Sequence, residues 1–180
     1  MGRIKITETG IKNLVIIEPE IFKDNRGCFF ELYNKQDFFE AGLFYNFVQD
    51  NVSKSFKGVL RGLHFQKHYP QAKLVTVTEG EVFDVAVDLR ENSDTYGKWY
   101  GLVLSESNKK QLLIPRGFAH GFLVLSENAT FHYKCDDFYH PDDESGLIWN
   151  DPDVGIIWPE MDNIIIKDKD KKYPLLNDLK

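Results

Sequence analysis

Five histidines are the side chains of this sequence best suited to proton transfer, and two of them share a local pattern. His64 follows Arg61-Gly62-Leu63 and His120 follows Gly117-Phe118-Ala119, so each comes after a glycine-containing turn and leads into an apolar strand. In a small β-barrel, such positions would project into one cavity. Imidazole titrates near neutrality, which suits a general base. For either histidine taken alone, a packing role in the core or at its rim is the ordinary alternative.

The segment from Pro115 to His120 also has the Pro-x-Gly-x-x-His spacing of the second motif of metal-binding cupins. The first cupin motif requires His-x-His followed by Glu, whereas here the residue two beyond His64 is Gln66 and the next histidine is His68. A divalent metal normally takes three or more protein ligands. Two well-placed histidines therefore favour a site without a metal.

A histidine base needs a group that fixes its tautomer, usually a carboxylate. Asp84, Asp88 and Asp170 are the candidates, and the sequence pattern does not choose among them. Lys73 begins a strand and, if it points into a pocket, can stabilise a developing oxyanion. Tyr133 can act as an acid from such a pocket. Exposed lysines and packing tyrosines are nevertheless common on strands.

Phosphate recognition has two candidates, Arg26 and Arg61, because guanidinium groups make charge-assisted forks to phosphate. The sequence has no GxGxxG or GxxxxGK[ST] phosphate loop and no GxSxG nucleophile elbow. Nucleotide enzymes and hydrolases of those types are therefore disfavoured.

The elements that must position these side chains are short strands. The segment 81–89 alternates with a period of two, which indicates a strand with one face in a core. One short helix is expected over 35–41, capped by Asn34 and ended by Gly42. The charged tail after residue 166 is typical of a solvated face. The other expected strands are 13–18, 27–33, 73–78, 101–104, 111–114, 121–125 and 130–134.

Spacings of roughly 8–12 residues between the later strands, with no helical pattern between them, predict a β-sandwich or barrel rather than a parallel βαβ sheet. The 180 residues fit one domain, spanning 1–180. A formal net charge of −6 argues against nucleic-acid binding, and no apolar run is long enough for a membrane span. The N-terminus has no secretory apolar region, and Cys28 and Cys135 form no disulfide framework, so a cytoplasmic protein is expected.

Six segments in one order closely resemble dTDP-4-dehydrorhamnose 3,5-epimerases, over about residues 16–176. They are Gln49-Asp50-Asn51, the 58–64 segment GVLRGLH, Ala72-Lys73-Leu74-Val75, the 82–90 segment VFDVAVDLR, the 114–122 segment IPRGFAHGF and Trp149-Asn150-Asp151-Pro152. The resemblance implies a mainly β, cupin-like jelly roll with few short helices. It also implies a homodimer, no metal or other cofactor, and dTDP-4-dehydro-6-deoxy-D-glucose as substrate.

The resemblance also implies roles for particular residues. His64 corresponds to the base and Tyr133 to the acid on the opposite face of the sugar ring, while Lys73 and His120 line the sugar site. Tyr139 matches the aromatic side chain on which thymine stacks, and the Arg26 segment is expected to reach the neighbouring subunit's site. The remaining nucleotide, phosphate and substrate contacts correspond to Arg26, Glu31, Gln49, Asn51, Arg61, Glu144 and Lys169.

The tail contains two Lys-Asp pairs, and the family places its base-orienting aspartate in such a pair four residues ahead of a proline. Counting back from Pro174 selects Asp170 and excludes Asp168. Lys167 stands where the family commonly has serine, and Thr76 and Ser145 stand where it often has arginine.

Three alternatives share part of this pattern. One is a related sugar-nucleotide epimerase that inverts a single carbon or acts on another nucleotide sugar. The others are a metal-dependent cupin oxygenase or isomerase and a non-catalytic sugar-binding cupin.

Overall fold

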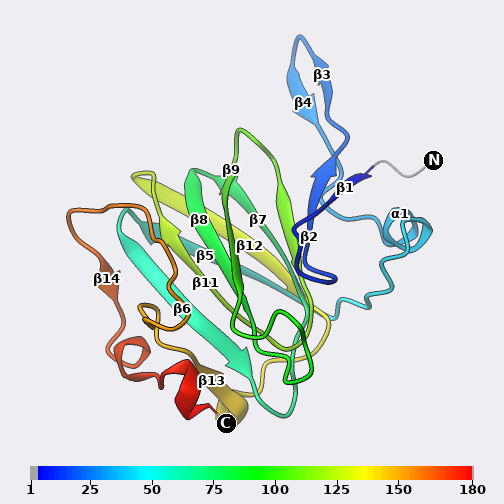
Figure 1. The fold of residues 1–180 in the computed structure, drawn as a ribbon. Helices are drawn as coiled ribbons and strands as arrows, with labels where there is room; N and C mark the ends of the chain where they lie inside the picture. The colour runs from blue at the N-terminus through cyan, green and yellow to red at the C-terminus, as the bar shows by residue number, and fades with distance from the viewer. Residues whose placement is uncertain (1–3, 180) are drawn as a thin grey trace.

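The structure, a computed structural model that describes residues 4–179, is built from two antiparallel sheets packed face to face (Figure 1). The first sheet has the order β1 (Ile4–Glu8), β2 (Val15–Pro19), β10 (Gln111–Ile114), β7 (Lys73–Glu79), β12 (Asn128–Cys135) and β5 (Gln49–Phe56). The second has the order β13 (Glu144–Gly146), β6 (Val59–Gln66), β11 (Phe118–Val124), β8 (Glu81–Asp88) and β9 (Trp99–Ser105), with β14 (Ile165–Ile166) parallel to β6. This confirms the mainly β, jelly-roll prediction.

The space between the sheets holds the largest hydrophobic core. Val75 and Phe131 from the first sheet meet Val82, Ala86 and Phe122 from the second. The predicted 81–89 strand is present as β8, with one face in this core as expected, but its other face is buried as well. Val85 and Val87 point the other way and are also fully buried, because the chain after residue 146 covers the outer face of the second sheet.

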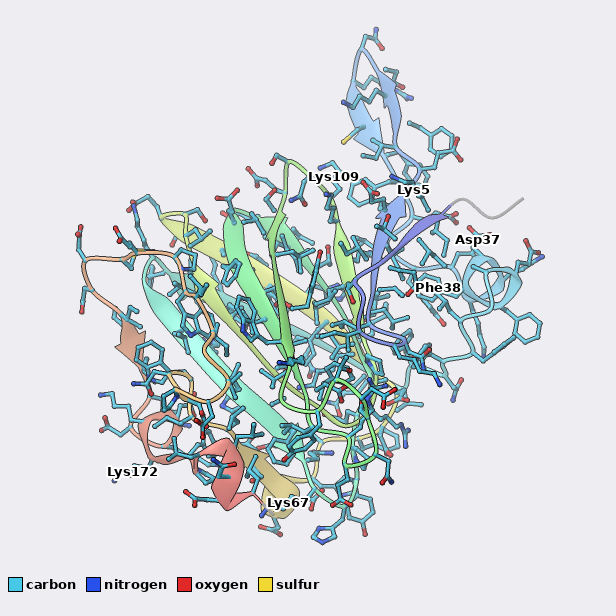
Figure 2. The ribbon with its side chains drawn as sticks, in the orientation of Figure 1. Lys5, Asp37, Phe38, Lys67, Lys109 and Lys172 are labelled. Atoms are coloured by element: carbon cyan, nitrogen blue, oxygen red, sulfur yellow. The ribbon has the colours of Figure 1, made fainter. Side chains whose placement is uncertain are left out.

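The helix α1 (Lys35–Glu40) confirms the predicted helix and its start. The side chain of Asn34 accepts a hydrogen bond from the backbone N–H of Gln36, at 3.0 Å, which satisfies one of the free donors of the first turn. Phe38 is the helix's buried residue and packs on β2, β7 and β10 (Figure 2). Short 3₁₀ helices lie at η1 (Pro141–Asp143), η2 (Asp170–Lys172) and η3 (Leu176–Asp178).

The predicted 27–33 strand is only partly present. Its first three residues form β4 (Gly27–Phe29), which pairs with β3 (Phe22–Asp24) in a hairpin that projects from the sandwich (Figure 1). All six strand residues of the hairpin are exposed, so no core contact extends the pairing further.

No turn precedes His64, contrary to expectation, because residues 59–66 form one continuous strand, β6. Gly62 has φ +119°, a conformation that favours glycine, and a Cβ there would lie 2.6 Å from the Cα of Gly121. This close backbone approach holds β6 against β11 and makes His64 and His120 direct cross-strand partners. Within residues 4–179, no helix is long and apolar enough to cross a membrane.

Candidate active site

A cavity of about 260 Å³ opens between the two sheets and gathers most of the predicted side chains. β6 supplies His64, β7 supplies Lys73 and β12 supplies Tyr133. The rest of its wall consists of Gln49, Asn51, Phe65, Gln66, Gln71, Cys135, Tyr139 and Glu144. Three segments far apart in sequence therefore bring a base candidate, an amine and a phenol to one space.

Asp170 is the carboxylate next to His64. The Nε2 atom of His64 lies 3.1 Å from Oδ1 of Asp170, within ion-pair distance although not aligned as a hydrogen bond. The backbone N–H of Gly62 donates to Oδ2 of Asp170 at 3.3 Å. Burial alone would raise the pKa of Asp170, but the His64 side chain and the Gly62 N–H outweigh it and hold that pKa below its usual value. Asp170 is therefore a buried carboxylate, aimed at the histidine.

The tail places Asp170, and not Asp168, at this position. β14 pairs with β6, and the 3₁₀ helix that follows begins at Asp170, whose side chain is 5% exposed. The side chain of Asp168 is 88% exposed and pairs with Lys171. The two Lys-Asp pairs thus have different surroundings, because only the second reaches the wall of the sandwich.

The other two aspartate candidates serve different partners. Asp84 lies 2.9 Å from Nε2 of His120, and both side chains are buried. Asp88 accepts hydrogen bonds from Arg90 and from two hydroxyl groups in the following loop. His120 is not among the residues that line the cavity, and it is buried beside Asp84.

Lys73 and Tyr133 have perturbed acidities. Burial lowers the pKa of Lys73, although nearby acidic groups, including Asp84 and Glu144, counteract part of this effect. Burial is also the main cause that raises the pKa of Tyr133. Within residues 4–179, neither the amine nor the phenol has a hydrogen-bond partner, so both are available to a molecule in the cavity.

Glu144 organises one rim of the cavity. It accepts hydrogen bonds from the Tyr139 hydroxyl, at 2.8 Å, and from the ammonium of Lys169. Gln49 accepts a hydrogen bond from the backbone N–H of Tyr139 and donates one to Asn51. The predicted nucleotide contacts on this side are therefore joined in one polar network.

Two further residues of the site, Tyr173 and Cys135, were not predicted from the sequence. The Tyr173 ring meets the His64 ring edge-on, with centroids 5.7 Å apart. It lies so close to Gly146 that a Cβ there would be 2.4 Å from the ring, which fixes its place. Cys135 lines the cavity near Asn51, and burial raises the pKa of its thiol to about 11. Tyr173 immediately precedes Pro174, the proline that locates Asp170 in the sequence. This position is the signal from which Tyr173 could have been predicted.

Arg26, Glu31 and Arg61 do not line this cavity within one chain. The side chain of Arg26 is 86% exposed at the tip of the β3–β4 hairpin, where it pairs with Asp24. Glu31 lies beside α1 and accepts a hydrogen bond from Asn34. Arg61 faces an adjoining cavity that also contains His64.

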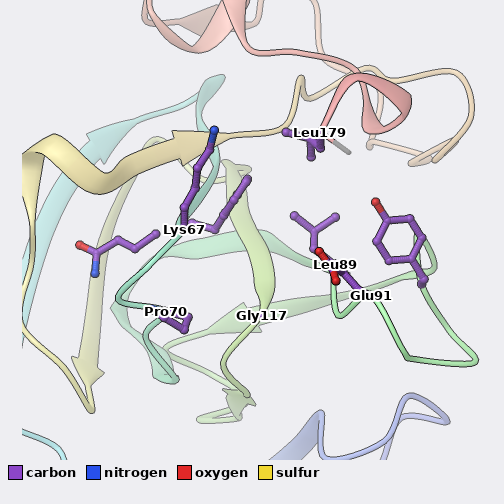
Figure 3. A pocket seen from close by; sticks show the side chains of 9 residues that line it. Lys67, Pro70, Leu89, Glu91, Gly117 and Leu179 are labelled. Atoms are coloured by element: carbon purple, nitrogen blue, oxygen red, sulfur yellow. The ribbon is translucent and has the colours of Figure 1, made fainter.

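A larger cavity, about 710 Å³, is a different space (Figure 3). Its wall includes Phe65, Lys67, Leu89, Glu91 and Leu179, and none of the predicted site residues. Its titratable groups are Lys67, Glu91 and Tyr96, with no histidine among them, so we assign the site to the smaller cavity, where His64, Lys73, Tyr133 and Glu144 converge. Among residues 4–179, no three His, Cys, Asp or Glu side chains gather as metal ligands do.

Comparison with known proteins places this architecture in one family. The family model for dTDP-4-dehydrorhamnose 3,5-epimerase matches residues 8–178. The dTDP-4-dehydrorhamnose 3,5-epimerases of Methanothermobacter thermautotrophicus and Escherichia coli are 53% and 51% identical, covering 99% and 98% of this chain and 97% and 96% of the relatives.

A solved structure gives the same result. The crystal structure of dTDP-6-deoxy-D-glucose-3,5-epimerase from Legionella pneumophila, in complex with dTDP-4-keto-L-rhamnose, is 50% identical with a TM-score of 0.94. The match covers 97% of this chain and 93% of that one. The chain therefore belongs to the dTDP-4-dehydrorhamnose 3,5-epimerase family.

Proposed function

We propose that this protein converts dTDP-4-dehydro-6-deoxy-D-glucose into dTDP-4-dehydro-L-rhamnose by inverting carbons 3 and 5. The observation that carries the proposal is the cavity itself, where His64 backed by Asp170 faces the same space as Lys73 and Tyr133. Family membership over residues 8–178 supports the substrate.

The chemistry follows from the ketone at carbon 4, which acidifies the protons on both neighbouring carbons. His64 removes one of these protons, and the electron pair of the broken C–H bond moves onto the ketone oxygen as an enolate. An N–H of Lys73 donates to that oxygen and stabilises its charge. Tyr133 returns a proton from the opposite face, which inverts the carbon. No net oxidation occurs, and the same steps at the second carbon complete the reaction.

The two sides of the imidazole suit this role. Nε2 of His64 is buried beside Asp170, whereas a third of the side chain is exposed. The carboxylate fixes the proton on Nε2 and leaves the lone pair of Nδ1 to accept the substrate proton. Asp170 then stabilises the imidazolium as it forms.

The rim of the cavity supplies the nucleotide contacts in this proposal. Thymine stacks on Tyr139, which is half exposed and held by Glu144. His120 supports the sugar site from behind the wall. The remaining contacts to the nucleotide and its phosphates come from Gln49, Asn51, Arg61, Glu144 and Lys169.

We also propose a cytoplasmic homodimer. Arg26 and Glu31 lie away from the His64 cavity of their own chain, and the hairpin that carries Arg26 projects outward. In a dimer, this segment reaches the partner's site. Both cysteines, Cys28 and Cys135, are free thiols, which suits a reducing compartment. Fractionation of cells followed by activity measurement checks the location.

Proton NMR of the reaction in deuterated buffer tests the activity. We expect deuterium to enter at carbons 3 and 5 of the substrate, together with formation of the inverted product. Uptake at one carbon alone would indicate the single-centre epimerase. Binding of dTDP without any exchange would indicate a sugar-binding protein, and turnover that chelators abolish would indicate a metal enzyme.

A further inference from the structure

A second cavity, of about 370 Å³, lies against the same catalytic histidine. It shares His64 and Glu144 with the first cavity, so the two spaces adjoin. The rest of its wall is formed by Val59, Leu60, Arg61, Ile165, Ile166, Lys167 and Asp170. Arg61 and Lys167 are its two cationic side chains.

Strand pairing fixes these two cations next to each other. β14 runs parallel to β6, with Ile165 opposite Val59 and Ile166 opposite Leu60. The residues that follow these pairs are Arg61, within β6, and Lys167, just beyond the end of β14. The backbone oxygen of Lys167 also accepts the N–H of Asp170, at 2.9 Å, so the turn that aims Asp170 at His64 is the one that begins at Lys167.

Lys167 differs from its neighbours in its ion pairing. The ammonium of Lys169 binds Glu144, and that of Lys171 lies 3.1 Å from Asp168. Within residues 4–179, no carboxylate lies within ion-pair distance of Lys167. The guanidinium of Arg61 donates through Nε to the Ser55 hydroxyl, at 3.0 Å, and likewise has no acidic partner there.

The carboxylates in the same wall are already engaged. Glu144 binds Lys169 and Tyr139, and Asp170 binds the Gly62 N–H beside His64. The cavity thus presents two cationic side chains with no carboxylate within ion-pair distance, in a chain whose formal net charge is −6, although the charge of Lys167 helps to lower the pKa of Asp170 in the same wall. A pair of cations at the spacing of neighbouring strands suits the oxygens of a phosphate group.

We propose that Lys167 is a ligand-binding residue, which together with Arg61 takes an anionic phosphate of the nucleoside diphosphate. This inference rests on the proposed function and adds to it a residue that the resemblance does not supply, since the family commonly has serine there. Lys167 lies in the wall of this second cavity and not beside Lys73 or Tyr133, so its main effect is on binding, with a smaller effect on proton transfer through Asp170.

Binding measurements on Lys167→Gln test the proposal, with Lys171→Gln as the matched control on the same tail. Isothermal titration with dTDP should show about fivefold weaker binding for Lys167→Gln, the size of one partly solvated ion pair. Thymidine, which has no phosphate, should bind both variants like the unmodified protein. KM should rise by a similar factor with a smaller change in kcat, and Lys167→Arg should restore most of the affinity.

Equal dTDP affinity in Lys167→Gln and the unmodified protein overturns the inference, as does an equal loss in Lys171→Gln, which would show a general effect of charge. A loss of thymidine affinity also overturns it, since it would point to a disturbed fold. If the unmodified protein neither binds dTDP nor exchanges substrate protons, the proposed function fails. Titration with inorganic pyrophosphate then decides the inference alone, because Lys167→Gln should still weaken pyrophosphate binding about fivefold.

Discussion

His64 is the residue on which the two cavities of the site converge. It forms part of both walls, while its Nε2 atom is buried against Asp170. A side chain in this position can touch the sugar on one side and remain oriented by a carboxylate on the other. Its cross-strand neighbour His120 has the same kind of partner, Asp84, but is buried and is not among the residues that line either cavity. Two His-Asp pairs therefore stand side by side, and only one is open.

The first prediction concerns the carboxylate that orients the base. Asp170→Asn keeps the shape of the side chain and removes its charge, so turnover should fall by roughly 10²–10⁴. Asp168→Asn should change turnover little, because that carboxylate is exposed and pairs only with Lys171. Steady-state kinetics on the two variants makes the comparison. A severe loss of turnover in Asp168→Asn with a mild loss in Asp170→Asn would show that Asp168, and not Asp170, orients His64.

The second prediction separates the base from the acid. Tyr133→Phe removes the phenolic proton while His64 and Asp170 stay in place. Exchange of substrate protons with deuterated solvent should therefore persist, whereas inverted product should form far more slowly. NMR measures both rates in one sample. Equal losses of exchange and product would show instead that Tyr133 positions the sugar.

At the scale of elements, the parts that local sequence determines were predictable. α1 has its cap, its buried Phe38 and its glycine end within nine residues, from Asn34 to Gly42. The β7 and β8 segments are rich in apolar residues and flank the Glu79-Gly80 turn, which predicts two consecutive strands. In each case the sequence pattern and the element that it predicts lie within one short segment. The prediction therefore needs no information about distant contacts.

Two of the missed strands, β5 and β14, owe their strand character to distant partners. β5 (Gln49–Phe56) is largely polar because it is an edge strand and its Gln49 and Asn51 line the cavity. β14 is only two residues long and exists through its pairing with β6. The same reason explains the site, because the pairing of His64 with Asp170 spans more than a hundred positions and only the resemblance indicated it.

The third prediction concerns the loop that follows β8. Asp88 has no exposed side-chain surface, and burial would raise its pKa, but bonds from Arg90, Ser93 and Thr95 lower it from 3.8 to about 2. Because the folded-state pKa is depressed, the carboxylate stabilises the fold at pH above about 4, and this contribution disappears as the pH falls through about 2. This contribution of Asp88 to the free energy of unfolding is about 2 kcal/mol.

Urea unfolding at several pH values checks this linkage. Asp88→Asn should lower the free energy of unfolding at pH 7, and the difference from the unmodified protein should shrink between about pH 4 and pH 2. Asp94→Asn, on the same loop, serves as the control. A difference that stays constant down to pH 2 would contradict the depressed pKa.

At the scale of the whole molecule, the β3–β4 hairpin is the part that the sandwich does not support. Its strand residues are all exposed, and Phe22 and Phe29 show 43% and 64% of their surface. An isolated two-stranded hairpin is marginally stable in water. Exposed aromatic rings on such an element favour a partner surface, which agrees with the proposed dimer.

The fourth prediction is that light scattering gives the mass of a dimer at micromolar concentration. The reason is the surface just described, since the two rings and the hairpin backbone need cover. Replacing both rings, in the variant Phe22→Ser/Phe29→Ser, should weaken the dimer and lower activity together. A monomer mass for the unmodified protein would contradict the shared-site proposal directly.

The last prediction tests whether one site uses residues of two chains. Arg26→Ala and His64→Ala should each be nearly inactive alone. In a mixed dimer, the His64 of one subunit meets the Arg26 of the other, so one of the two sites is complete. After full exchange of equal amounts, half of the dimers are mixed, and about a quarter of the unmodified activity should return by this symmetry.

The matched control mixes His64→Ala with Tyr133→Phe, whose side chains line one cavity of the same chain. Each site of that mixed dimer carries one defect, so epimerisation should not recover. Labelled subunits that transfer energy on mixing establish that exchange has occurred. Recovery in the Arg26 mixture alone is the pattern that a shared site produces. If proven exchange restores nothing there, Arg26 acts within its own chain or not at all, and the projecting hairpin must serve the dimer without entering its chemistry.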